Sequence, residues 1–278
     1  MSHQRTFFPA ALVALSTLLS AGCPPCPPER KAGPVLVAEE RRFVRSTADC
    51  DSGGPDCSSF LASYPSIACV TAPAVAESLN TIVRAFLLAG ADGGLQEAAG
   101  RFLTTPGGTP GGGGRRLQRR VELLFDSLGI ATLRLSTELS RSIGQTERSV
   151  HLRMVDTKKG RTLGIEDLFV PGYAPTLRRL GLAALRAAAA DAAAPLPAPD
   201  QPGGTPLLAA VPRNAAVVPG GLLLAFTPGE AAPHAREGVT CVVPFDSLLL
   251  LIRRDGPLSP LSPWSVGTGS QAVMPPGS

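Results

Sequence analysis

Apolar and polar residues alternate with a period of two between residues 118 and 156. The alternation runs through residues 121–125, 133–139 and 150–154. Successive residues of a strand point to opposite faces of a sheet, so this pattern predicts three strands with one apolar and one polar face. Residues 156–160 (DTKKG) predict a tight turn after the third strand. We therefore expect an antiparallel sheet in the middle of the chain.

Two longer segments repeat their apolar residues at helical spacing. The first follows Thr71, its expected N-cap, has Pro73 in its first turn and stops before Gly90, and the second covers residues 174–190. The apolar stripes are Val75, Leu79, Ile82, Val83, Phe86 and Leu87 in the first, and Leu177, Leu180, Ala184, Leu185 and Ala188 in the second. A weaker helical pattern covers residues 95–103.

Further β-type segments flank these elements. Residues 35–47 predict an edge strand and residues 58–70 an extended segment, while the apolar runs 222–226 and 239–243 predict a closing hairpin around a loop rich in Pro and Gly. Together the elements predict an α+β fold, in which an antiparallel β-sheet carries two main helices packed on one face.

The first residues predict export. Arg5, an apolar stretch at residues 6–19 and the small residues before Cys23 form a secretory signal that is shorter than the roughly twenty residues of a membrane span. With Cys23 at the cleavage junction, residues 19–23 (LSAGC) resemble the lipobox of a bacterial lipoprotein. We expect residues 1–22 to be the signal peptide and lipid on Cys23 to anchor the chain to the bacterial membrane, on the periplasmic side or at the cell surface. Ordinary cleavage nearby is the alternative.

Glycine (30 residues) and proline (28) are concentrated in a few segments of the 278-residue chain. Residues 23–34 predict a proline-rich tether, and one domain is expected over residues 35–254, with insertions at 105–114 and 193–205. The remaining residues, 255–278, are expected to form a disordered tail. The glycines of 105–114 do not end in the Gly-Lys-Ser/Thr of a phosphate-binding loop.

Cysteines are usually paired in exported proteins. Cys50 and Cys57 are separated by a short turn-forming stretch and are a candidate disulfide, and Cys69 with Cys241 would tie the start of the fold to its end. Connectivity does not follow from the sequence alone. The spacing lacks the paired CxxC and histidine pair of a zinc site, and we expect no metal and no cofactor.

Four arginines follow the glycine-rich insertion: Arg115, Arg116, Arg119 and Arg120. They are either the solvated start of a strand or a contact for anionic lipid or cell-wall polymer. The net charge of the whole chain is only +4, and an exported protein rarely meets nucleic acid, so no nucleic-acid partner is expected.

Three segments resemble the extracytoplasmic domain shared by RsiV anti-sigma factors and the N-terminal part of PdaC-type peptidoglycan deacetylases. They are Tyr64-Pro65-Ser66-Ile67, residues 156–169 (DTKKGRTLGIEDLF), and residues 214–252, which include PHAREG at 233–238 and VVPFDSL at 242–248. The resemblance implies this fold and a binding role facing the cell wall, with a lysozyme-like protein or a glycan as ligand.

The chain departs from that pattern in several places. Gly229 and His234 replace tyrosines, residues 142–148 (SIGQTER) replace a Gly-Gly-Ala-His motif, and neither the anti-sigma segment nor the deacetylase domain is expected in this chain. The departures concentrate in the loop 227–238, which is therefore the predicted ligand-binding loop. Its candidate contact residues are Thr227, Glu230, His234 and Arg236.

No catalytic constellation is recognisable. Beyond the leader the only histidines are His151, on the polar face of a predicted strand, and His234, and there is no Gly-x-Ser-x-Gly or His-x-x-x-His pattern. Asp246 is expected to be a helix N-cap, and Glu166-Asp167 the first turn before an apolar docking element. We expect a monomeric, non-enzymatic binding module. The alternatives are a structural lipoprotein of an envelope complex and a hydrolase acting on cell-wall material.

Overall fold

A computed structural model describes residues 36–47, 50, 57–69, 71–89, 93–105, 114–141, 145–191, 212, 214–226 and 239–262. All of them belong to one unit, Gly33–Ser278. The signal peptide with Cys23, the tether and the predicted binding loop with Thr227, Glu230, His234 and Arg236 lie outside the described residues. So do residues 106–113 and 192–211, which contain most of the two predicted insertions.

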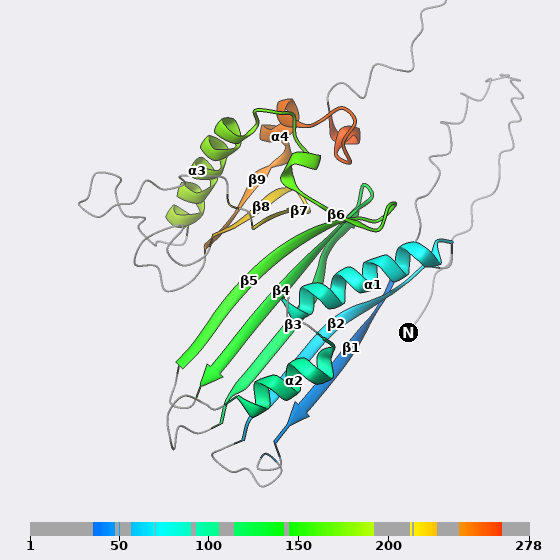
Figure 1. The fold of residues 1–278 in the computed structure, drawn as a ribbon. Helices are drawn as coiled ribbons and strands as arrows, with labels where there is room; N and C mark the ends of the chain where they lie inside the picture. Colours follow the sequence, from blue (N-terminus) through cyan, green and yellow to red (C-terminus); the bar gives the residue numbers. More distant parts are fainter. Residues whose placement is uncertain are drawn as a thin grey trace, which may run out of the picture. The chain divides into compact units, whose positions relative to one another are not determined.

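Six strands form the larger sheet, in the order β1-β2-β3-β4-β5-β6 (Figure 1). They are β1 (Val37–Ser46), β2 (Ser59–Ala68), β3 (Arg116–Ser127), β4 (Ile130–Arg141), β5 (Gln145–Asp156) and β6 (Arg161–Leu163). The predicted edge position of β1 and the three alternating strands are confirmed. Neighbouring strands are antiparallel, with the single exception of β2 and β3. These two are parallel because a long helical crossover connects them.

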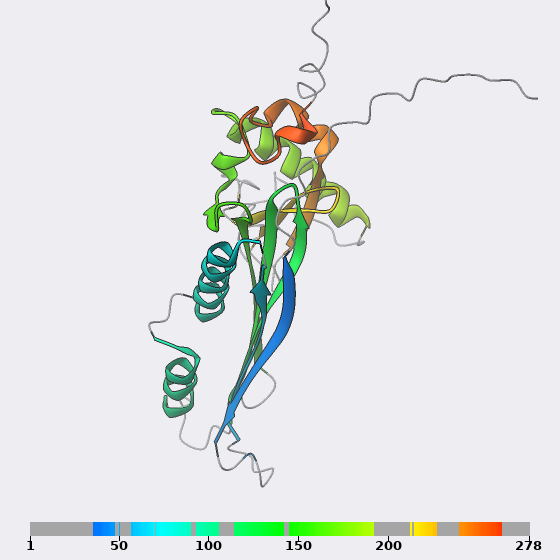
Figure 2. The same cartoon turned by 90° about the vertical axis from the view of Figure 1, so that its right-hand side faces the viewer.

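The crossover consists of α1 (Pro73–Leu88) and α2 (Leu95–Thr104), which lie on the same side of the larger sheet (Figure 2). Helix α1 buries its predicted stripe, including Leu79, Val83 and Phe86, against Phe60 of β2 and Leu133 of β4. The predicted N-cap of this helix is one residue too early. Ala72 is the N-cap and makes no side-chain hydrogen bond, so Thr71 is not the cap; at the other end Ala89 takes the left-handed conformation.

A second, three-stranded antiparallel sheet contains β7 (Ala215–Val218), β8 (Gly221–Phe226) and β9 (Val239–Pro244). The turn between β7 and β8 places Gly220 at φ +88°, a backbone conformation that glycine adopts without strain. Helix α3 (Ala174–Asp191) packs against β9 and buries Leu177 and Leu185. The α+β class is thus confirmed, but the two main helices cover different sheets and do not share one face.

The second sheet lies against the side of β4 and β5 opposite to α1. The hydroxyl of Thr132 donates to the carbonyl oxygen of Val217, while the neighbouring Leu133 points into the core beneath α1. Asn214 reaches β5 with both ends of its side-chain amide: Oδ1 accepts from Leu152 N (2.6 Å) and Nδ2 donates to Val150 O (2.8 Å). These contacts join the two sheets into one structure.

The fold continues beyond the predicted end of the domain. After α4 (Phe245–Leu248), residues 251–253 run beside residues 168–170, with Val170 N donating to Leu251 O and Arg253 N donating to Leu168 O. A 3-10 turn (Ser259–Leu261) follows, and Leu258 is completely buried in the same core as Phe169. The expectation that residues 255–278 form a disordered tail is therefore wrong for residues 255–262. No described helix is both long and apolar enough to cross a bilayer.

Candidate functional site

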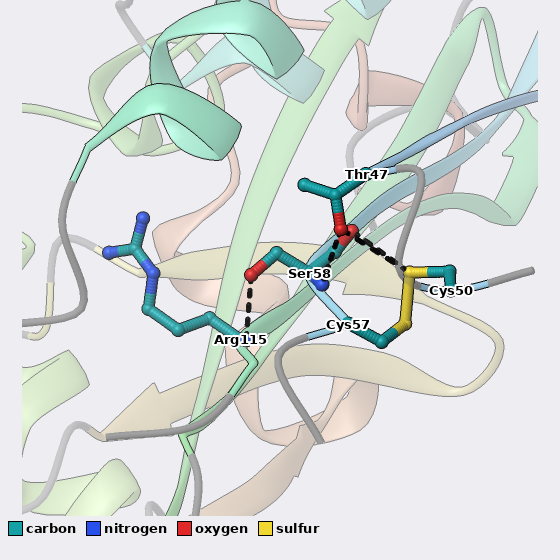
Figure 3. The surroundings of a disulfide bond; sticks show 5 residues. All are labelled: Thr47, Cys50, Cys57, Ser58 and Arg115. Atoms are coloured by element: carbon teal, nitrogen blue, oxygen red, sulfur yellow. Dashed lines mark hydrogen bonds between the residues drawn. A yellow bond between two sulfur atoms is a disulfide. The ribbon is translucent and has the colours of Figure 1, made fainter. Parts of the chain in front are cut away.

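The predicted disulfide between Cys50 and Cys57 is present (Figure 3). It closes the connection between β1 and β2 next to a small hydrogen-bonded cluster. Ser58 N donates to the hydroxyl of Thr47 (3.1 Å), and Arg115 N donates to the hydroxyl of Ser58 (3.1 Å). The disulfide therefore sits where β1, β2 and β3 meet, and its role is structural.

The other candidate pair does not form a disulfide. Cys69 and Cys241 are both free and buried. Cys69 lies just after β2, with its sulfur 3.5 Å from the hydroxyl of Thr71. Cys241 belongs to β9 and faces α3, where its thiol lies 3.8 Å from Gly181 O. The two thiols do not pair because Cys241 packs in the core of the second sheet, whereas Cys69 directly follows the last residue of β2 in the first sheet.

The four clustered arginines separate onto the two faces of β3. Arg115 and Arg119 lie on the helix side. Arg115 donates to the carbonyl oxygens of Phe102 and Thr105 at the end of α2, and its guanidinium stacks over the Phe102 ring at 4.7 Å. Arg119 Nη1 donates to Leu87 O (3.1 Å) and Leu88 O (2.9 Å) at the end of α1. Each of these arginines thus caps one helix C-terminus, where positive charge is stabilising.

Arg119 makes no ion pair with a described carboxylate, and burial lowers its pKa. Its Nε is buried without a hydrogen-bond partner. Arg116 and Arg120 are exposed on the opposite face, where Arg120 pairs with Glu122 (3.2 Å). The cluster is therefore not one cationic patch. Neither interpretation describes Arg115 and Arg119, which bind helix ends. Arg116 and Arg120 are exposed near the start of β3, as a solvated strand start requires.

One concave region is a groove between α1 and the strands β1 and β2, with a volume of about 710 Å³. We call it the α1 groove. Its lining residues are Arg41, Tyr64, Ser66, Ala68, Cys69, Pro73, Ala76, Glu77, Asn80 and Arg84. Two of them, Tyr64 and Ser66, belong to the Tyr-Pro-Ser-Ile segment of the sequence resemblance. The structure thus places that segment beside an open groove.

The polar groups of the α1 groove differ in how far they are already engaged. Asn80 is occupied, because its amide bonds both backbone groups of Ile67. Arg41 is paired with Glu39 at 3.3 Å. Arg84 is exposed and forms no ion pair with another described residue. A guanidinium in this state, next to an aromatic ring and a hydroxyl, can bind a carboxylate or a sugar.

None of the residues considered for catalysis forms a catalytic arrangement within the described chain. His151 is exposed on β5. Asp167 accepts from Gly164 N (2.8 Å) and pairs with Arg161 (3.0 Å), an arrangement that fixes the turn before the buried Leu168. Asp246 lies in the first turn of α4, whose N-cap is Pro244, so the predicted cap is wrong. The described residues contain no group of three His, Cys, Asp or Glu side chains that could hold a metal ion.

The α1 groove could not be found from the sequence, because Arg41, Tyr64 and Arg84 are far apart in the chain. The only signal was the family-like Tyr64 segment. The division of the arginines, by contrast, could have been found. Residues 115 and 119 have the same parity in a strand and must share a face, and residues 116 and 120 must share the other.

No family model matches the chain, and no curated protein matches it. Solved structures share its fold, among them two of DUF3298 family proteins. The crystal structure of a DUF3298 family protein from Pseudomonas aeruginosa PAO1 has a TM-score of 0.60 and 17% identity, and the match covers 79% of this chain and 95% of that one. The crystal structure of a DUF3298 family member from Bacteroides fragilis NCTC 9343 has a TM-score of 0.63 and 12% identity, covering 80% and 96%. At these identities the likeness concerns the fold alone: the chain has the fold seen in DUF3298 family proteins.

Proposed function

We propose that this chain is an exported, lipid-anchored protein of the bacterial envelope, whose folded domain binds cell-wall glycan in the α1 groove without catalysing a reaction. The lipobox-like residues before Cys23 support the export and anchoring. The fold shared with DUF3298 proteins is compatible with the RsiV/PdaC-type resemblance, and the resembling residues 64–67 and 156–169 lie within the folded domain. The observation that carries the proposal is the position of Tyr64 and Arg84 on opposite sides of one open groove.

The chemistry of the α1 groove favours a peptidoglycan fragment. The ring of Tyr64 offers an apolar surface with a polar end, which suits the mixed surface of a sugar. Arg84 offers a guanidinium with no described partner, which suits the carboxylate of a lactyl group or stem peptide. Glu77 on the same helix can accept hydrogen bonds from hydroxyl groups.

Titration calorimetry with the full mature chain and a soluble peptidoglycan fragment of two disaccharide-peptide units tests this proposal. Arg84→Ala should weaken binding at least tenfold, since a charge-assisted bond to a carboxylate is lost. Arg116→Ala is the matched control, because this exposed arginine lies on the opposite face of the sheet, and it should bind like the natural chain. Equal binding by Arg84→Ala would remove the α1 groove from the proposal.

Two further outcomes separate the alternatives. Turnover of the fragment by the natural chain would contradict the non-enzymatic assignment. Binding of a lysozyme-like protein, unaffected by Arg84→Ala and lost when residues 227–238 are replaced, would make a protein the ligand and that loop the binding surface. The intact mass of the mature protein tests the anchor, because lipid on Cys23 adds the mass of its acyl chains.

A further inference from the structure

Strand β1 forms one edge of the larger sheet, and β2 is its only strand partner among the described residues. It is ten residues long, and all but one of these residues are exposed. The opposite edge strand, β6, has only three residues. A long exposed edge presents a row of unpaired backbone N–H and C=O groups, and proteins normally shorten, cover or charge such an edge. Strand β1 is neither short nor, within the described residues, covered by another strand.

The charges on β1 do not exclude a second copy of the same strand. Charges of one sign would repel it, but the centre of β1 reads Glu39-Glu40-Arg41-Arg42, two acidic residues followed by two basic ones. Reversing the direction of this segment exchanges acid for base. In an antiparallel copy, acidic residues of this segment can therefore face basic residues of the partner.

Two large apolar residues of β1 are also exposed. Val37 and Val44, near opposite ends of the strand, are among the large apolar side chains that remain exposed, at 56% and 65%. Phe43 and Arg41 lie on the helix side: Phe43 contacts the ring of Phe60, and Arg41 lines the α1 groove. Side chains alternate along a strand, so Val37 and Glu39 lie on that side as well, and Val44 lies on the other.

We propose that two copies of this chain associate through β1, as antiparallel strands related by a twofold axis at Glu40, to form one continuous twelve-stranded sheet. A twofold axis between antiparallel strands is perpendicular to the sheet and places one residue opposite its own counterpart. With Glu40 at the axis, Glu39 faces the partner's Arg41, and Val37 faces the partner's Phe43. The exposed side chain of Val37 thus gains an aromatic neighbour.

The neighbouring symmetric register is less favourable. With Arg41 at the axis, Glu40 faces the partner's Arg42, but the two Arg41 side chains face each other. Glu39 then faces the partner's Phe43, and Val37 faces the partner's Arg45. With Glu40 at the axis, the two Glu40 side chains do face each other. Each of them is already paired with Arg42 of its own strand at 3.3 Å, which offsets part of the repulsion between the two carboxylates. Opposite charges and aromatic–β-branched pairs at facing positions both stabilise a strand pair.

This association replaces the expectation of a monomer and does not depend on the proposed function. It concerns the free edge of the sheet, whereas ligand binding concerns the α1 groove, although Arg41 belongs to both. Sedimentation measures dimer formation through β1, and calorimetry measures ligand binding in the α1 groove. Either proposal can therefore fail while the other stands.

Sedimentation equilibrium of the full mature chain at several concentrations tests the association. The natural chain should show a dimer that dissociates on dilution. Glu39→Arg should weaken the dimer about tenfold or more, because two facing pairs become repulsive. Arg41→Glu should do the same, and the double variant Glu39→Arg/Arg41→Glu should restore the dimer because the facing charges are again opposite. Arg116→Glu, the control on β3, should leave it unchanged. A monomer at all concentrations, or no rescue by the double variant, would overturn the proposal.

Cross-linking reads out the register. Facing residues of antiparallel strands have Cα atoms about 4.5–5.5 Å apart, which is within disulfide range. Glu40→Cys should form a disulfide-linked dimer under mild oxidation, whereas Arg41→Cys should not. Efficient linkage of Arg41→Cys in place of Glu40→Cys would contradict a register with Glu40 at the axis.

Discussion

The side-chain amide of Asn80 makes two hydrogen bonds to the backbone of Ile67, the same two that a neighbouring strand would make. Its Oδ1 accepts from Ile67 N (2.8 Å), and its Nδ2 donates to Ile67 O (2.7 Å). The parallel pairing of β2 with β3 covers only residues Ser59–Ser63 of β2, so the backbone of Ile67 lies beyond the reach of β3. The side chain of α1 thus completes the sheet at this point and fixes the helix to the end of β2.

Asn80→Ala should lower the free energy of unfolding by about 1–3 kcal/mol, because two partly buried backbone groups lose their partners. Urea denaturation followed by circular dichroism measures this loss. Thr81→Ala on the same helix is the control: the Thr81 hydroxyl is exposed and bonds only Glu77 O of its own helix. If Asn80→Ala lowers the free energy of unfolding no more than Thr81→Ala does, water replaces the Asn80 amide as the hydrogen-bond partner of Ile67.

Arg119→Glu should destabilise the fold by roughly 2 kcal/mol or more. The new carboxylate would face the carbonyl oxygens of Leu87 and Leu88 at the negative end of α1. Arg116→Glu makes the same charge change on the same strand, but on its exposed face, and should cost less than about 0.5 kcal/mol. Thermal unfolding of the two variants side by side separates a capping role from a general loss of positive charge.

The arginines also show where sequence reasoning succeeds and where it stops. Alternation located β3, β4 and β5, and it could have assigned Arg115 and Arg119 to one face. It could not reveal that this face meets the ends of two helices. Strand β7 was missed because Ala215–Val218 is buried on both faces and does not alternate. The apolar stripe of α3 showed which face of the helix is buried, but it could not indicate which sheet covers that face.

Acid should weaken the turn that leads into Leu168. The hydrogen bond from Arg161, together with the one from Gly164 N, holds the pKa of Asp167 below its ordinary value. A carboxylate with a lowered folded-state pKa contributes stability above its unfolded pKa of about 4, and this contribution is lost as the pH falls through the folded value.

Asp167→Asn should therefore reduce stability at pH 7 and flatten the decline of stability below about pH 4. Denaturation series at pH 3, 4, 5 and 7 measure both effects. Asp246→Asn, an exposed first-turn residue with no ion pair among the described residues, should follow the natural curve. The same curve for Asp167→Asn would mean that the ion pair contributes nothing.

The two free thiols should differ in reactivity. Burial raises the pKa of Cys241 to about 11, whereas the hydrogen bond with Thr71 lowers the pKa of Cys69. Because the thiolate is the nucleophile, iodoacetamide at pH 8 should modify Cys69 first and leave Cys241 intact in the folded protein. Peptide mass spectrometry measures the order, and Thr71→Val should slow the reaction of Cys69. Equal rates, or a disulfide between the two, would contradict the structure.

The return of residues 251–253 beside residues 168–170 has a consequence for the order in which the molecule is completed. Leu168 and Phe169 are covered by Ile252 and Leu258, which lie more than 80 positions later in the chain. During synthesis, Leu168 and Phe169 are therefore made long before Ile252 and Leu258, which cover them. The larger sheet can pair early from neighbouring strands, but the second core stays open until residues 252–258 have been made. The half of the fold built around α3 is thus the last to close.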